Sequence, residues 1–192
     1  MKEYKTINGE QALVPETLKD VTVQQLMDFS ELGELGNDFD SMSKLLNVLT
    51  GFTIKDFYFS DFMEITGIVS KLLSTPPADE AITDFDLFGV HYKARKLEEF
   101  SAAEFMDFDT LSAEPMRNLP TLLALIFIDH EDENYIDGVQ RRANEFLCLD
   151  AETAQRALVF FSKAFLEYAK TIVSSLDQEN PTVKEMKKML NL

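Results

Sequence analysis

Cysteine, histidine, tryptophan and glycine are scarce in this chain of 192 residues. It has one cysteine, Cys148, two histidines, seven glycines and no tryptophan. A single cysteine forms no internal disulfide and no cysteine-based zinc site, so disulfide scaffolds and zinc fingers are excluded. The sequence around the cysteine, FLCLD, is apolar, so we expect an inert thiol in the core.

Long apolar runs are also missing. The longest uncharged stretch, residues 118–128, has eleven residues, whereas a membrane-spanning helix needs about twenty. The first residues, MKEYKTINGEQ, contain no apolar segment of the kind that directs secretion. We therefore expect a protein without membrane spans that works in the cytoplasm.

Basic residues are few relative to acidic ones. The chain has 18 Lys and Arg against 34 Asp and Glu, a formal net charge of −16. General binding to nucleic acid is excluded, because phosphate contacts need a surplus of basic side chains. Apolar residues make up 45% of the chain. A chain of this size buries about 70% of its surface on folding, so we expect a folded protein and not a disordered acidic tail.

Motifs that carry chemistry are absent as well. No phosphate-binding glycine loop and no G-x-S-x-G turn occurs. His91 lies in a predicted strand, where we expect its ring at the surface. His130 belongs to the acidic loop DHEDEN, which is either a solvated loop or a Ca²⁺ or Mg²⁺ site, although its spacing is not that of a calcium-binding loop. We expect no catalytic residue, no metal site and no cofactor; a metal-dependent enzyme centred on residues 129–137 is the weakest alternative.

The first part of the chain predicts a hairpin followed by helices. Asn8-Gly9 is a strong signal for a hairpin over residues 1–15, because both central turn residues favour positive φ. Thr22 and Gln25 form a capping box that starts a helix. Apolar residues at helical spacing predict two more helices, one with Met42, Leu45, Leu46 and Leu49 before Gly51, and one with Phe62, Ile65, Val69 and Leu72.

Residues 74–84, STPPADEAITD, break the helical pattern. A second hairpin around Gly89 follows, and Ser101 with Glu104 forms another capping box. Further helices are expected over residues 115–128, over 138–147 with Val139, Ala143 and Phe146 inward, and after Asp150, where one stripe holds Leu158, Phe161, Phe165, Tyr168, Ile172 and Leu176. Asn180-Pro181 predicts the start of a terminal helix.

The two parts of the chain are alike. Residues 22–32 align without gaps on residues 101–111, with both capping boxes matched. Identical pairs are Met27 and Met106, Asp28 and Asp107, Phe29 and Phe108, and Leu32 and Leu111. We expect a mainly α fold with two short β-hairpins (α+β), in which two similar hairpin-plus-helices halves pack as a pseudo-repeat. The expected divisions are residues 1–75, residues 83–176, and a terminal helix or tail at 177–192.

Sixteen phenylalanines and eight methionines are available for the core and for binding a partner. Some of them lie on more than one face of their helices, and a groove lined by Phe and Met suits an adaptable apolar partner. The candidate partner-binding residues are Phe57, Phe59, Phe160, Met186, Met189 and Leu190. The last three belong to the segment PTVKEMKKMLNL, the most basic local stretch. It either docks on the protein's own body, frays, or binds a partner.

Two sets of motifs together resemble a known family. The first half contributes TVQQLMDFSEL and LLNVLTGFTIKDF. The second half contributes FGVHYKAR, the S-x-x-E-F-x-D-F helix and TLLALIFIDHEDENYID. Over about residues 16–176, this layout resembles the tail assembly chaperones and related small tail-region proteins of tailed bacteriophages.

The resemblance implies a non-enzymatic role. Such chaperones hold the long, apolar, helical tape-measure protein and keep it soluble until the tail tube assembles around it. The implied partner is a phage structural protein, either tape-measure or tail tube, in the host cytoplasm or in association with the virion. Nucleic acid and membrane are not expected partners, and assembly into a homo-oligomer stays open. The alternative hypothesis is an acidic inhibitor that mimics DNA and blocks a nucleic-acid-binding enzyme.

Overall fold

The structure is a computed structural model that describes residues 1–33, 38–76, 79–129, 135–175 and 188–189. Seven α-helices and two small antiparallel sheets in these residues confirm the predicted α+β class. The first half contains β1 (Lys2–Lys5), β2 (Gln11–Val14), α1 (Val23–Glu31), α2 (Phe39–Thr50) and α3 (Phe59–Leu73). The second half contains β3 (Asp84–Leu87), β4 (Val90–Ala94), α4 (Ala102–Leu111), α5 (Leu119–Ile126), β5 (Phe127–Ile128), α6 (Tyr135–Phe146) and α7 (Ala151–Ser175).

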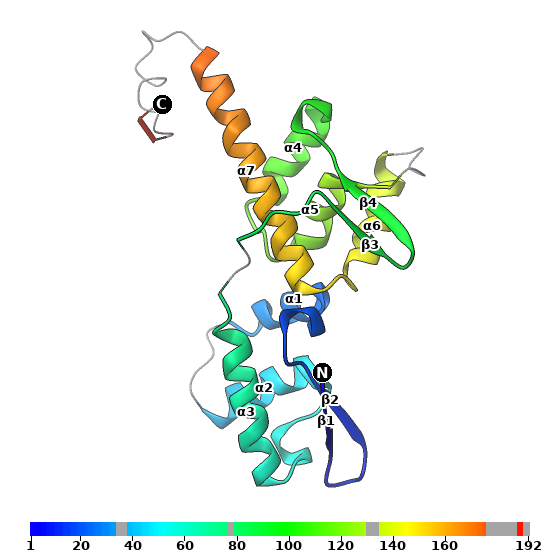
Figure 1. The fold of residues 1–192 in the computed structure, drawn as a ribbon, viewed down its shortest axis with the longest axis vertical. Helices are drawn as coiled ribbons and strands as arrows, with labels where there is room; N and C mark the ends of the chain where they lie inside the picture. The colour runs from blue at the N-terminus through cyan, green and yellow to red at the C-terminus, as the bar shows by residue number, and fades with distance from the viewer. Residues whose placement is uncertain (34–37, 77–78, 130–134, 176–187, 190–192) are drawn as a thin grey trace.

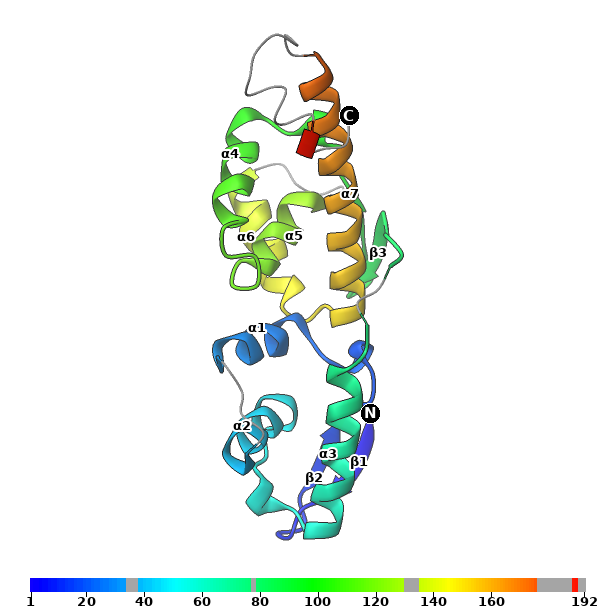
Figure 2. The same cartoon turned by 90° about the vertical axis from the view of Figure 1, so that its left-hand side faces the viewer.

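The molecule is elongated, with the two halves stacked along its long axis (Figures 1 and 2). Helices α2 and α3 and the β1–β2 hairpin lie at one end. Helices α4–α7 and the second sheet lie at the other end, with α1 between them.

Local signals predicted the starts of α1, α4 and α7 correctly. The Thr22 and Ser101 hydroxyls accept hydrogen bonds from the backbone N–H groups of Gln25 and Glu104, which confirms both capping boxes. Asp150 caps α7 by accepting a hydrogen bond from the N–H of Thr153 at 2.9 Å. The apolar stripes are confirmed too, since the buried residues of α2 and α3 are those predicted: Leu45, Leu46, Leu49, Phe62, Ile65, Val69 and Leu72.

Both hairpins are present, but the turn of the first one differs from the expectation. The first has a five-residue loop, in which the N–H of Thr6 donates to the carbonyl of Glu10 and only Gly9 has a positive φ, of 85°. The two-residue turn with positive φ at both positions occurs in the second hairpin, at Phe88 (53°) and Gly89 (79°). Asn-Gly therefore marks a hairpin here without setting its turn type.

The helix predicted over residues 115–128 is shorter than expected. It begins at Leu119, after a turn that contains Pro115, and it ends at Ile126. Phe127 and Ile128 form β5 instead, which pairs with Ala94 and Lys93 of β4. Aromatic and β-branched residues favour strands, and β4 offers an unpaired edge for them.

The repeat extends further than the aligned segment. A 3₁₀ turn precedes each capped helix, at Leu18–Asp20 and at Leu97–Glu99, and the turns have the same spacing to the helices that follow. In each turn the third residue's carboxylate accepts a hydrogen bond from the N–H of the residue before the turn. The second half departs from the first by adding β5 and α7. That each half is a separate domain stays a prediction.

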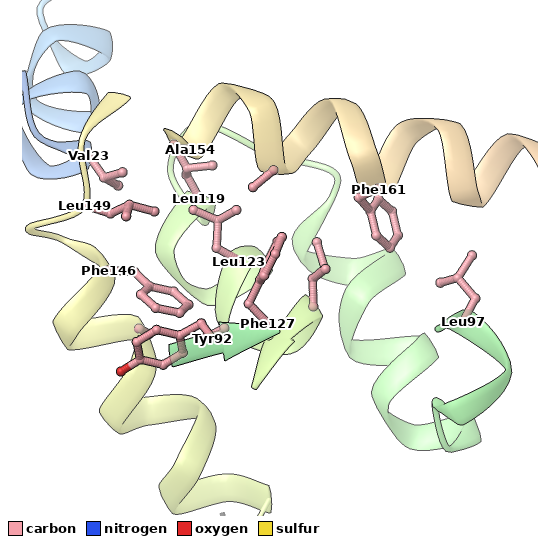
Figure 3. Packing of buried hydrophobic residues seen from close by; sticks show 14 residues of the cluster. Val23, Tyr92, Leu97, Leu119, Leu123, Phe127, Phe146, Leu149, Ala154 and Phe161 are labelled. Atoms are coloured by element: carbon pink, nitrogen blue, oxygen red, sulfur yellow. The ribbon is translucent and has the colours of Figure 1, made fainter. Parts of the chain in front are cut away.

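Two hydrophobic clusters form the core, one for each half. At the junction, each cluster includes a residue that belongs to the other half. Val23 of α1 is fully buried in the second-half cluster, where it lies next to Leu149 (Figure 3). Ala151 of α7 is fully buried in the first-half cluster. Backbone bonds join the same segments, with the N–H of Val23 donating to Leu149 and that of Ala151 to Val21, both at 2.8 Å.

The prediction for Cys148 is wrong, because its side chain is exposed. It lies just after α6, where Phe146 and Leu149 turn into the core. Cys148, one of the two residues between these neighbours, faces outward even though the local sequence is apolar.

Candidate functional site

An apolar groove of about 670 Å³ runs between α4 and α7. Apolar residues repeat at helical spacing on both helices, so those of one helix lie on the same side: Phe105 and Phe108 of α4, and Leu158, Phe161 and Phe165 of α7. The full lining is Phe105, Phe108, Asp109, Ser112, Pro115, Leu122, Leu158, Phe161, Ser162, Phe165 and Leu166. We call this the α4–α7 groove.

The aromatic rings of the groove pack against one another. The ring centroids of Phe108 and Phe161 are 4.1 Å apart, and those of Phe161 and Phe165 are 6.0 Å apart. Phe105 of α4 stacks on Phe165 of α7 with 6.3 Å between the ring centroids, so the row of ring contacts spans both helices. The contacts of Phe165 with Phe161 and Phe105 lie within the range of favourable ring pairs, and the pair of Phe108 and Phe161 is closer than that range.

The groove has a buried floor and an accessible rim. Phe161 and Leu122 form the floor and are almost fully buried, and Phe161 points from α7 toward α4 in Figure 3. Phe165 and Leu166 at the rim keep 40% and 43% of their surface exposed. Asp109 is the only charged side chain among the described residues of the lining. Such a surface offers burial to an apolar segment and no acid–base pair for catalysis.

A buried ion pair fixes the start of α4. Both Nη atoms of Arg95 donate to Glu104, the second at 3.2 Å, and the N–H of Ser101 donates to the same carboxylate at 2.7 Å. Burial opposes ionisation of Glu104, but the bonds from Arg95 and Ser101 outweigh it and lower its pKa to about 2. Arg95 also lies over the ring of Phe100, 4.7 Å from its centroid. The wall of the groove is thereby tied to the end of β4.

A second polar cluster lies in the same half. Nη2 of Arg141 donates to both oxygens of Asp129, at 2.7 and 2.9 Å, and Nη1 donates to Glu145 at 3.1 Å. The hydroxyl of Tyr92 donates to Glu145 as well, and burial together with this bond raises the pKa of Tyr92 to about 12. Each charge meets an opposite charge, so this cluster joins β4, α6 and the end of β5 as a structural element.

The structure does not bring the predicted partner-binding residues together. Phe57 is buried in the first-half cluster, whereas Phe59 at the start of α3 is 72% exposed. Phe160 is half-buried beside Phe127, at 6.4 Å between centroids. Met189 is exposed. Met186 and Leu190 lie outside the described residues.

The groove residues Phe105, Phe165 and Leu166 were missed as candidates. The sequence pattern predicts Phe165 on the core-facing stripe of the last long helix and Phe105 within a capped helix. The available signal was the length of the apolar stripe on α7. This helix of 25 residues carries more apolar residues than the 10-residue helix α4 can cover. Only the placement of α4 shows which of them stay accessible.

The described part of the chain contains little that supports a catalytic or metal site built from histidine and carboxylate side chains. His91 is exposed, as expected, and its Nδ1 lies 2.9 Å from Asp86. No three His, Cys, Asp or Glu side chains gather around a metal-sized space in that part. His130 and the rest of the predicted acidic loop, residues 130–134, lie outside it.

No helix among the described residues has the length and apolar character needed to cross a membrane. None of the protein-family models, curated proteins or solved structures compared with the chain matches it.

Proposed function

We propose that this chain is a non-enzymatic binding protein that holds an apolar helical segment of a partner in the α4–α7 groove. The observation that carries the proposal is the groove itself, a preformed aromatic channel with an exposed rim at Phe165 and Leu166. An amphipathic helix that lays its apolar face into such a channel gains affinity from the apolar area removed from water.

The proposed partner class follows the resemblance to phage tail assembly chaperones. Such a chaperone holds a tape-measure or tail tube protein in the host cytoplasm until assembly. The net charge of −16 supports this role. Complexes of like charge repel one another, so they stay in solution while the chaperone binds the apolar segment of its partner.

The alternative, a DNA mimic, relies on that same charge. Six carboxylates accept hydrogen bonds from backbone N–H groups at the starts of helices and 3₁₀ turns, where they serve local structure: Asp20, Asp38, Asp56, Glu99, Glu104 and Asp150. The positions of these carboxylates are set by the helices and turns that they cap. They therefore favour a solubilising surface over an array of charges that copies the phosphates of DNA.

Coexpression with an apolar tape-measure segment tests the proposal. The native chain is expected to move the segment into the soluble fraction. A double variant, Phe165→Ser with Leu166→Ser, is expected to lose this effect and to bind the segment more than tenfold more weakly, because each lost side chain contributes about 1.5 kcal/mol or more of burial. Thermal unfolding of the variant checks that the fold is kept.

The matched control is Phe88→Asn, which removes an exposed aromatic ring from the tip of the β3–β4 hairpin. It is expected to bind like the native chain. Insolubility of the segment with the native chain would contradict the proposal, as would equal loss of binding in the control. Capture of a nuclease or polymerase that DNA displaces would favour the mimic instead.

A further inference from the structure

The α4–α7 groove has two different ends, because its helices run in opposite directions. Phe105, near the start of α4, packs on Phe165 of α7, whereas Phe108 further along α4 packs on the earlier residue Phe161. Helix α7 begins at the junction of the two halves and runs away from it (Figures 1 and 2). The end of α4 therefore lies at the junction side of the groove, and its start lies at the far side.

The junction side of the groove is negatively charged. Asp109, near the end of α4, is exposed and is the only charged residue in the described lining. None of the ion pairs among the described residues includes Asp109. The carbonyl groups at the C-terminal end of α4 add a partial negative charge at the same place. This side of the groove therefore favours a cation, or the positive end of another helix.

Charged residues toward the far side are paired instead. At the start of α4, both Nη atoms of Arg95 donate to the carboxylate of Glu104. On α7, Nζ of Lys170 lies 3.2 Å from a carboxylate oxygen of Glu167, the residue after Leu166. The two sides of the groove thus differ in charge, and Asp109 together with the end of α4 accounts for the difference.

We propose that the α4–α7 groove binds a partner helix in one direction, antiparallel to α4, with a lysine or arginine of the partner's first turn against Asp109. This direction brings the positive end of the partner's helix dipole to the acidic side of the groove. The aliphatic stem of the basic residue then lies along the apolar wall while its charged head reaches the carboxylate. The proposal rests on the proposed function, because it uses the same groove, and it adds the direction and the charge of the partner helix.

Two helical peptides of identical composition test the role of Asp109. Both carry the same apolar face, but one has two lysines in its first turn and the other has them in its last turn. Their net charges are equal, so the overall charge of −16 on the chain attracts both alike. Isothermal titration calorimetry gives the ratio of the two Kd values for each variant of the chain.

Asp109→Asn is expected to shift this ratio by about threefold, against the peptide with lysines in its first turn, because one exposed ion pair is lost. Comparing ratios cancels any difference in helicity between the free peptides. The matched control is Glu98→Gln, which removes the same charge from an exposed residue in the 3₁₀ turn before α4 and is expected to leave the ratio unchanged. A ratio that Asp109→Asn does not change would overturn the role of Asp109.

Cys148 provides a probe for the direction of the bound helix. It is the one cysteine of the chain and is exposed, three residues before α7 begins, so a nitroxide can be attached there. The chain has no tryptophan, so a tryptophan on the peptide is the only one that emits. From Leu158 to Leu166 the groove follows α7 away from the label for about 12 Å. We expect the nitroxide to quench a tryptophan at the first residue of the peptide more strongly than one at the last residue.

Equal quenching at both ends of the peptide, or stronger quenching at its last residue, would overturn the proposed direction. If both peptides still bind tightly in that case, the proposed function is kept and the direction alone is wrong. Binding of neither peptide would contradict the direction and the proposed function together. The double variant Phe165→Ser with Leu166→Ser is expected to lose most of its affinity for both peptides, which verifies that the measured binding takes place in the groove.

Discussion

At the scale of single residues, the ion pair between Arg95 and Glu104 has a measurable pH dependence. The pKa of Glu104 falls from 4.5 to about 2 in the folded chain. A carboxyl whose pKa is lower in the folded than in the unfolded state stabilises the fold above the unfolded pKa, and this contribution is lost as the pH falls from 4.5 through 2. The shift corresponds to about 3 kcal/mol.

Glu104→Gln is therefore expected to lower the free energy of unfolding by about 3 kcal/mol at pH 7 and by much less near pH 2. Urea unfolding followed by circular dichroism at several pH values measures the difference. Glu98→Gln, at an exposed neighbour, serves as the control and is expected to change stability by less than about 0.5 kcal/mol. The same loss for Glu104→Gln at pH 7 and pH 2 would show that the charge is not its cause.

Cys148 shows how far single residues can be predicted. The apolar sequence FLCLD indicated a buried position correctly for Phe146 and Leu149, which the core takes up. It did not indicate that Cys148, one of the two residues between them, faces outward, because that depends on where α6 ends. By contrast, the capping residues Thr22, Ser101 and Asp150 were predictable, since their partners lie three residues away.

At the scale of elements, the β3–β4 turn contains an unusual residue. Phe88 has a φ of 53° and 70% of its surface exposed. Residues other than glycine, asparagine and aspartate pay strain energy in this region, and the first position of such a turn favours asparagine. Phe88→Asn is expected to raise the free energy of unfolding by about 1 kcal/mol, measured by urea unfolding.

Ile7→Asn is the matched comparison for Phe88→Asn. Ile7 is an exposed apolar residue in the loop of the first hairpin, and its φ is not positive. We expect no gain in stability there. A loss of stability in Phe88→Asn would mean that contacts of the ring outweigh the strain of its backbone.

The elements that the sequence did not predict depend on contacts between distant segments. Strand β5 has two residues and exists because β4 pairs with it, so periodicity within residues 115–128 had no means of separating it from α5. The α4–α7 groove is similar, because Phe105 and Phe165 meet only after the helices pack. Helices with regular stripes, such as α2 and α3, were predicted because their signal is local.

At the scale of the whole molecule, the two halves are joined by exchanged core residues. Val23 lies in the second-half cluster and Ala151 in the first-half cluster, and backbone hydrogen bonds connect them. We expect the native chain to unfold in a single transition. Val23→Ala removes two buried methyl groups and is expected to lower the free energy of unfolding by about 2 kcal/mol.

Urea unfolding with calorimetry as a second method measures both expectations. Val48→Ala, at a half-buried position outside both clusters, is the control and is expected to cost less. Two separate transitions in the native chain would show that the junction does not couple the halves, and would support folding of residues 1–75 and 83–176 as independent domains.

Helix α7 gives this architecture a mechanical property. Its first residue, Ala151, is anchored in the first-half cluster, and Phe165 lines the groove in the second half. The helix rises by about 21 Å over the fourteen steps from Ala151 to Phe165. A tilt of about 5° at Ala151 corresponds to a displacement of Phe165 by about 2 Å, which can be compared with the 4.1 Å between the ring centroids of Phe108 on α4 and Phe161 on α7. One helix thus links the position of Phe165 in the groove to the packing of Ala151 in the first half.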